Sequence, residues 1–293
     1  MSKEKTAEKI IKKRSRGAEI WRNFRKNKGA MIALAYLLLL FTVALTADLW
    51  IPQDKIAGMH IKDKLQSPNA TYWFGTDEMG RDLFWRVIYG ARSSLAIGFV
   101  SVMISLLIGV PLGSVAGYFG GKVENLIMRF VDIFAAIPAI LMSMVIVAVL
   151  GQKIENLMLA VGIAAVPSFT RITRAAVLTV KNNEYVEAAR ALGKSNAYVI
   201  FHHILPNCLS PIIVQVTLRV ASAIISASSL SFLGIGVKPP TPEWGALLNA
   251  GNAKIRSAPY LTVFPGLAIM LTVLAFNLVG DGIRDAMDPK LKH

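Results

Sequence analysis

Long uncharged, mainly apolar runs dominate the sequence and set its architecture. Four of them hold 19 or more residues, at positions 29–47, 93–121, 133–152 and 257–280. Each is long enough to cross about 30 Å of hydrocarbon as an α-helix. The length of these runs therefore predicts membrane-spanning helices rather than the amphipathic helices of a soluble domain.

Two further runs are interrupted by arginine and complete the predicted bundle. Residues 156–180 contain Arg171 and Arg174, which can snorkel to water near a helix end. Residues 211–236 are apolar or small except for Arg219, which is tolerable where it faces protein or water. We therefore predict an all-α integral membrane protein with six transmembrane helices.

Small residues and prolines within the runs predict how these helices pack. Gly109, Gly113 and Gly117 recur every four residues, so they form one flat helix face that another helix can approach closely. Packing inside a single bundle is favoured over a dimer motif. Prolines within four spans predict kinks, at Pro111, Pro138, Pro167 and Pro265.

Composition excludes most soluble classes. The chain is 54% hydrophobic and 17% charged, with Cys208 as its single cysteine, which excludes disorder and a disulfide scaffold. The net charge of +14 is concentrated in residues 1–28, which hold 11 of the 32 lysines and arginines. A basic tail directly before the first apolar run indicates a cytoplasmic tail beside anionic lipid and an uncleaved anchor, not a nucleic-acid binder.

Charge counts along the six spans predict the topology. With the tail inside, inner segments carry 21 lysines and arginines and outer segments carry ten. Both termini are then cytoplasmic. This gives a tail at 1–28, a transmembrane domain at 29–283 and a C-terminal tail at 284–293, with outer loops at 50–90 and 237–259 and an inner loop at 181–210.

The sequence contains no recognisable catalytic or metal site. The string Gly-Lys-Ser at 193–195 imitates the end of a phosphate-binding loop, but the glycine required five residues earlier is Ala188. His202 and His203 are adjacent, so on a helix they point about 100° apart. We predict no catalytic residue, no metal site and no cofactor bound by this chain.

The inner loop at 181–210 has an unusual local pattern. Helix-forming residues lead to Gly193, which suits a left-handed helix end, and a second helix is predicted to start at Ser195 or Asn196. Pro206 and Pro211 are expected to prevent uninterrupted continuation into the membrane. Two short helices along the membrane surface could act as a lever on a cytoplasmic partner, whereas the simpler alternative is an ordinary loop.

The spacing in this loop resembles the EAA loop of the membrane subunits of bacterial ABC importers. The residues that carry the resemblance are Glu187, Ala188, Ala189, Gly193, Leu205 and Pro206. Three further segments resemble the second, C-type membrane subunit of dipeptide, oligopeptide and nickel permeases. They are FGTDEMGRD at 74–82, PPTPEWG at 239–245 and FNLVGDGIRDAMDP at 276–289.

The resemblance implies a type I importer fold, a prokaryotic cytoplasmic-membrane location, and a coupling helix around Glu187 that docks on an ATPase. It also implies partners: a homologous second permease, one or two ABC ATPase subunits that hold ATP and Mg²⁺, and an extracytoplasmic binding protein. The cargo would be a short peptide, with nickel or another small solute as alternatives. A self-contained secondary transporter is the rival class, but it needs intramembrane carboxylates, and the nearby acids lie at span ends.

Two sets of residues are candidates for contact with the cargo or with a partner. Arg219, Ser222 and Ser226 share a helix face and could line the translocation path, although Arg219 could instead snorkel to the interface. Asp77, Arg81, Asp82 and Trp244 lie in outer segments and are candidate external contacts. For these four, local ion pairing at a turn and a purely structural loop are the alternatives.

Overall fold

The computed structural model describes residues 16–287, and this part is built from helices without strands. Five helices are long and apolar enough to cross a membrane: α2 (Lys28–Trp50), α4 (Leu83–Phe119), α7 (Ile154–Val180), α10 (Leu205–Phe232) and α12 (Tyr260–Met287). Shorter helices connect them: α1 (Arg16–Phe24), α3 (Gln53–Ala57), η1 (Ile61–Asp63) and α11 (Trp244–Asn252). Of the predicted tails at 1–28 and 284–293, residues 1–15 and 288–293 lie outside the described residues, residues 16–24 form α1, and residues 284–287 belong to α12.

The predicted third span is not one helix. It consists of α5 (Gly121–Ala136) and α6 (Ala139–Leu150), which meet at an angle of 84°. The break follows from Pro138, which has no backbone N–H and pushes Ile137 out of the helical conformation to ψ 127°. The kink predicted at Pro138 is therefore confirmed, and it is sharp enough to divide the span into two helices. Counted as one span, the bent pair completes the predicted six.

The other intramembrane prolines lie inside continuous helices. Pro111 is within α4, Pro167 within α7 and Pro265 within α12. Only at Pro138 does the chain change direction sharply enough to end one helix and begin another.

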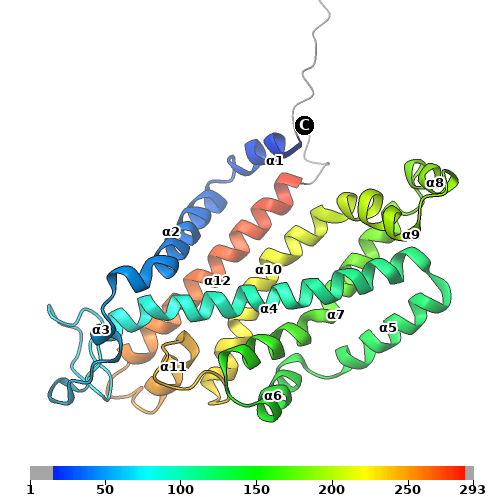
Figure 1. Cartoon of the computed structure of the whole chain (residues 1–293). Helices are drawn as coiled ribbons and strands as arrows, with labels where there is room; N and C mark the ends of the chain where they lie inside the picture. The colour runs from blue at the N-terminus through cyan, green and yellow to red at the C-terminus, as the bar shows by residue number, and fades with distance from the viewer. Residues whose placement is uncertain (1–15, 288–293) are drawn as a thin grey trace, which may run out of the picture.

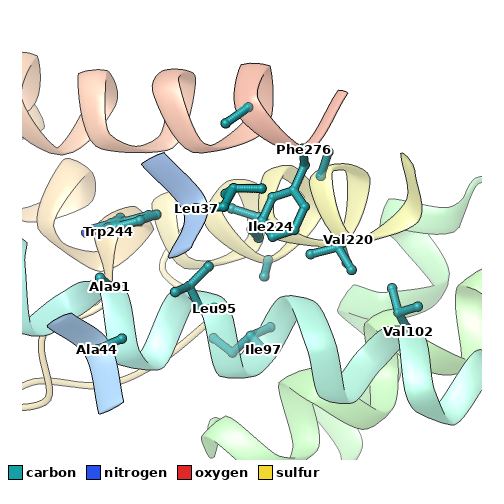
Figure 2. Packing of buried hydrophobic residues seen from close by; sticks show 14 of the residues in the cluster. Leu37, Ala44, Ala91, Leu95, Ile97, Val102, Val220, Ile224, Trp244 and Phe276 are labelled. Carbon is teal, nitrogen blue, oxygen red and sulfur yellow. The ribbon is translucent and has the colours of Figure 1, made fainter. Parts of the chain in front are cut away.

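A long, oblique α4 organises the bundle. It holds 37 residues, or about 55 Å of helix, and crosses α10 and α7 (Figure 1). On the other side, α12 packs between α2 and α10. The shared core contains Leu37 of α2, Leu95 of α4, Ile224 of α10 and Phe276 of α12, which converge in Figure 2.

The glycine face of α4 is the contact surface for α7. A Cβ added at Gly109 would lie 2.6 Å from the Cβ of Phe169, and one at Gly113 would lie 2.5 Å from the carbonyl oxygen of Thr170. The third glycine, Gly117, meets Val177 in the same way. The prediction that these glycines serve packing inside one bundle is confirmed.

The two ends of the bundle carry different elements. Figure 1 shows α1, the last turn of α12 and the segment after α7 at one end, and α3 and α11 at the other. Contact with α12 holds α1 at its end of the bundle, because Phe24 is buried beside Gly282. Both described chain ends therefore lie at the end that also carries the EAA-like loop.

Candidate functional site: the loop between α7 and α10 and the α10 cavity

The first helix of the EAA-like loop is α8 (Glu184–Ala191), as the sequence predicts. Its C-terminal end is a Schellman motif: the amide of Lys194 donates to the carbonyl of Ala189 at 3.2 Å, and that of Gly193 to Arg190 at 2.9 Å. Gly193 adopts φ +72°, the left-handed conformation predicted for it. This turn reverses the chain immediately after α8.

The second helix of the loop continues into the membrane, contrary to the prediction of a break at Pro206 and Pro211. Ser195 accepts a hydrogen bond from the amide of Tyr198 and caps α9 (Asn196–Tyr198). A π-helical segment, η2 (Val199–Ile204), then joins α9 to α10. The wider turn, in which the amide of Leu205 donates to Ile200, accommodates Pro206 in the first turn of α10.

Buried contacts fasten α8 to the transmembrane helices. Val186 and Ala189 are buried against a cluster that reaches α7, η2 and α10. Tyr118, at the end of α4, joins both halves of the loop: its hydroxyl donates to Asn196 Oδ1 at 2.8 Å, and the Arg190 guanidinium lies 4.6 Å from its ring centre. These contacts therefore connect α8 and the second half of the loop to the end of α4.

The opposite side of the loop is exposed. Glu187, Ala188 and Gly193 face solvent, whereas Ala189 is buried and Leu205 is half-buried. Leu192 is 77% exposed and Phe201 is 62% exposed, which leaves apolar side chains uncovered at this end of the molecule. Glu187 and Ala188 thus lie on an exposed surface that also carries apolar side chains, a combination found at protein interfaces.

Arg219, Ser222 and Ser226 come together as predicted. All three line a small cavity of about 60 Å³ between α6, α7 and α10. The guanidinium of Arg219 donates to Ser168 Oγ of α7, and Gln215 Nε2 donates to the same oxygen at 2.9 Å. The cation is thus held by protein inside the bundle and faces a cavity that is lined mainly by alanine and serine.

At the other end of the molecule, the predicted external residues Asp77, Arg81 and Asp82 form interactions within the chain. Asp77 Oδ2 accepts from Arg81 Nε at 2.7 Å, and Asp82 caps α4 by accepting from the amide of Phe84. Burial raises the pKa of the Asp82 carboxyl. These interactions are the local pairing that the sequence left open as an alternative.

Trp244 is not an external contact. Its side chain is 1% exposed, and its indole N–H donates to the carbonyl of Val87 at 2.8 Å. The aromatic ring lies in the core beside Gly90 of α4, where a Cβ would be 3.2 Å from the indole Cδ1. The glycine therefore allows the ring to pack closely against α4.

Two buried charges escaped sequence analysis. Glu243 is fully buried and caps α11 by accepting from the amides of Gly245 and Ala246, both at 2.9 Å. Burial raises the pKa of its carboxyl, against the opposing effect of these hydrogen bonds. Arg86, in the first turn of α4, is 3% exposed. No pattern in the sequence distinguishes Arg86 from Arg92, which is exposed on the same helix.

Sequence comparison decides the family. Residues 109–293 match the family described as "Binding-protein-dependent transport system inner membrane component", and residues 15–68 match the "N-terminal TM domain of oligopeptide transport permease C". The chain belongs to this permease family. Members are membrane-embedded transport subunits of ABC importers and not enzymes themselves, so this chain is a multi-pass inner-membrane protein of the C-type permease branch.

Relatives and solved structures agree with this assignment. The permease is 45% identical to a dipeptide transport system permease protein of Alkalihalophilus pseudofirmus, over 94% of this chain and 90% of that protein. It is 47% identical to a glutathione transport system permease protein of Escherichia coli, with the same coverage. The inward-facing MetNI methionine ABC transporter shares its fold, with TM-score 0.58 and 20% identity over 70% of this chain and 98% of that chain.

Proposed function

We propose that this permease forms, with a homologous second permease, the translocation path of an ATP-driven importer of short peptides. Its relatives at 45–47% identity are named for dipeptide and glutathione transport, and glutathione is itself a tripeptide. Nickel or another small solute is the alternative cargo. One or two ABC ATPase subunits would hold ATP and Mg²⁺, and an extracytoplasmic binding protein would deliver the peptide.

The exposed EAA surface of α8 carries the proposal. Glu187 and Ala188 are free to contact an ATPase, while Val186 and Ala189 anchor the same helix to α4, α7 and α10. Closure of the ATPase subunits on ATP would move α8, and the contacts of Tyr118 would pass this movement to α4. The transmembrane helices would then switch between an inward-open and an outward-open arrangement.

The sidedness of the chain belongs to the same proposal. Docking on cytoplasmic ATPase subunits requires that α8 face the cytoplasm, and the described chain ends lie at the same end of the bundle (Figure 1). Both termini are then cytoplasmic, in line with the basic residues of the N-terminal segment. Loops 50–90 and 237–259 face the binding protein.

Substitutions in α8 and its cap test the proposal in the complete transporter reconstituted in liposomes. Glu187→Lys reverses the charge of the docking surface and should lower peptide uptake at least about tenfold while the ATPase subunits still hydrolyse ATP. Gly193→Val should act similarly, because a β-branched residue is strained at positive φ, whereas Gly193→Asn should retain most uptake.

Gly151→Val is the matched control. Gly151 also has positive φ and open space around it, but it lies between α6 and α7, away from α8. It should leave the coupling of hydrolysis to uptake intact. Normal uptake by both Glu187→Lys and Gly193→Val at normal expression would remove the coupling role. Uptake by this chain alone, driven by an ion gradient, would favour a secondary transporter.

A further inference from the structure

A second cavity lies at the end of the molecule opposite α8. It has a volume of about 160 Å³ and lies between the start of α4, the Asp77–Arg81 turn and α11. One side is apolar, with Leu247 and Leu261, and the other contains the charged side chains of Asp77, Arg81 and Arg86. The proposed path around Arg219 does not share any of these residues.

The buried charges in this cavity do not balance. Asp77 is fully engaged: its Oδ1 accepts from the amides of Met79 and Arg81, and its Oδ2 accepts from Arg81 Nε at 2.7 Å. Arg86 Nε is 3.8 Å from the same Oδ2, beyond hydrogen-bond distance. The other lining acid, Glu78, is exposed and lies 3.6 Å from Lys254. Two buried guanidinium groups therefore share one buried carboxylate.

Arg86 is held in place without being satisfied. Its Nη1 donates to the carbonyl of Ile56 at 3.0 Å, which fixes the side chain against α3. Its Nε is buried and has no hydrogen-bond partner. An unsatisfied buried cation is costly, and a carboxylate is the ligand that a guanidinium binds best, through paired N–H donors.

The cavity has a volume of about 160 Å³, which leaves room for the carboxylate and the methylene groups of an acidic side chain. The apolar wall of Leu247 and Leu261 suits the methylene groups of such a side chain.

We propose that this cavity receives an acidic side chain of the extracytoplasmic binding protein, which completes the pairing of Arg86 and Arg81. The inference rests on the proposed function, because it requires that this end of the molecule face the binding protein. The site would be a specific docking point on the outer surface, separate from the peptide path.

The test is the stimulation of ATPase activity by the peptide-loaded binding protein, titrated against the complete transporter in nanodiscs. Arg86→Gln should raise the half-saturating concentration of binding protein about tenfold, with the wild-type rate regained at saturation, since a buried partner of a charged group is lost. Arg86→Lys keeps the charge, so its half-saturating concentration should lie between those of the wild type and Arg86→Gln. The salt dependence of the half-saturating concentration should weaken in Arg86→Gln.

Two further variants guard against trivial outcomes. Arg92→Gln is the matched control, because Arg92 lies on the same helix but is half-exposed and pairs with Asp48; it should change the half-saturating concentration less than twofold. Ala250→Leu fills the cavity from α11 while leaving both arginines intact, and it should reproduce the effect of Arg86→Gln. If the Arg86→Gln transporter does not assemble, the half-saturating concentration of Ala250→Leu tests the inference instead.

Half-saturating concentrations within twofold of the wild type for both cavity variants would overturn the inference and leave an intramolecular ion cluster only. A changed dependence on peptide concentration, at saturating binding protein, would also overturn it and identify the peptide carboxylate as the occupant. Absence of any stimulation in the wild-type transporter would instead contradict the importer function itself.

Discussion

Arg219 illustrates how a single residue can be placed at an intermediate depth of a membrane protein. It lies 14 residues into α10, or about 21 Å along the helix, where an unpaired charge would be costly. Ser168 of α7 accepts a hydrogen bond from its guanidinium, and Ser222 and Ser226 line the same cavity. These partners support a role inside the bundle over simple snorkelling at the surface.

Arg219→Gln should reduce uptake of free peptides at least about fivefold, and reduce uptake of C-terminally amidated peptides much less. The reason is that a fixed cation in the path stabilises a peptide carboxylate but gains nothing from an amide. Uptake of both peptide types is measured at matched expression and ATPase activity. Equal losses would show that Arg219 serves only the contact with Ser168; Ser222→Ala controls for disturbance of the cavity wall.

Glu243 predicts a pH dependence of stability. Burial raises the pKa of its carboxyl, so the folded state favours the protonated form. Its contribution to stability is therefore present below the ordinary carboxyl pKa and is lost as pH rises through the raised value. The thermal midpoint of the purified transporter should fall more steeply between pH 5 and 8 in the wild type than in Glu243→Gln. Parallel curves for the wild type and Glu243→Gln would contradict this.

At the scale of helices, the contact of α4 with α7 depends on the absence of side chains. Three glycines at four-residue spacing bring the α4 backbone against Phe169, Thr170 and Val177 of α7. The same contact holds the end of α4, and with it Tyr118, in position under α8. Close helix packing and the proposed coupling role of α8 therefore depend on the same interface.

Gly113→Ala should destabilise the permease by about 1–3 kcal/mol, because its Cβ would overlap the carbonyl of Thr170 and the Cβ of Thr173. Thermal unfolding in detergent should show a midpoint several degrees lower. Gly266→Ala in α12 is the control, since the nearest atom to its Cβ would be 3.8 Å away. A midpoint for Gly113→Ala no lower than for Gly266→Ala would refute tight packing at this contact.

At the scale of the whole molecule, the number of membrane spans determines which surfaces lie on the same side of the membrane. With the bent α5–α6 pair counted as one span, α1, α8 and the end of α12 lie at one end, and the Arg86 cavity and α11 at the other. The proposed docking surfaces for the ATPase and the binding protein are thus separated by the full thickness of the bundle.

Cysteine labelling tests this arrangement. In a Cys208→Ser background, Ser195→Cys should resist an impermeant thiol reagent in intact cells, whereas Asn69→Cys should react. Both positions are exposed, so the difference reports on sidedness alone. Cysteines at Ser15 and Lys292, outside the described residues, should behave as Ser195→Cys does. Strong labelling of Ser195→Cys from outside would overturn the six-span topology.

The sequence by itself determined the features that depend on local composition. Uncharged apolar runs located the membrane helices, four-residue glycine spacing indicated the α4–α7 contact, and Gly193 marked the end of α8. Each of these follows from hydrophobicity or backbone preference within one segment, which a chain carries before it folds.

Tertiary structure alone decided the partners of polar groups and the continuity of helices. Glu243 meets Ser94, and Trp244 meets the carbonyl of Val87, across roughly 150 residues of intervening chain. No periodicity within one segment encodes such a pairing. Proline likewise indicated a possible break at both Pro138 and Pro206, but only the folded chain shows a sharp bend at the first and a π-helical turn leading into α10 at the second. The physical reason is that a missing backbone donor can be accommodated in several ways, and the neighbouring helices select among them.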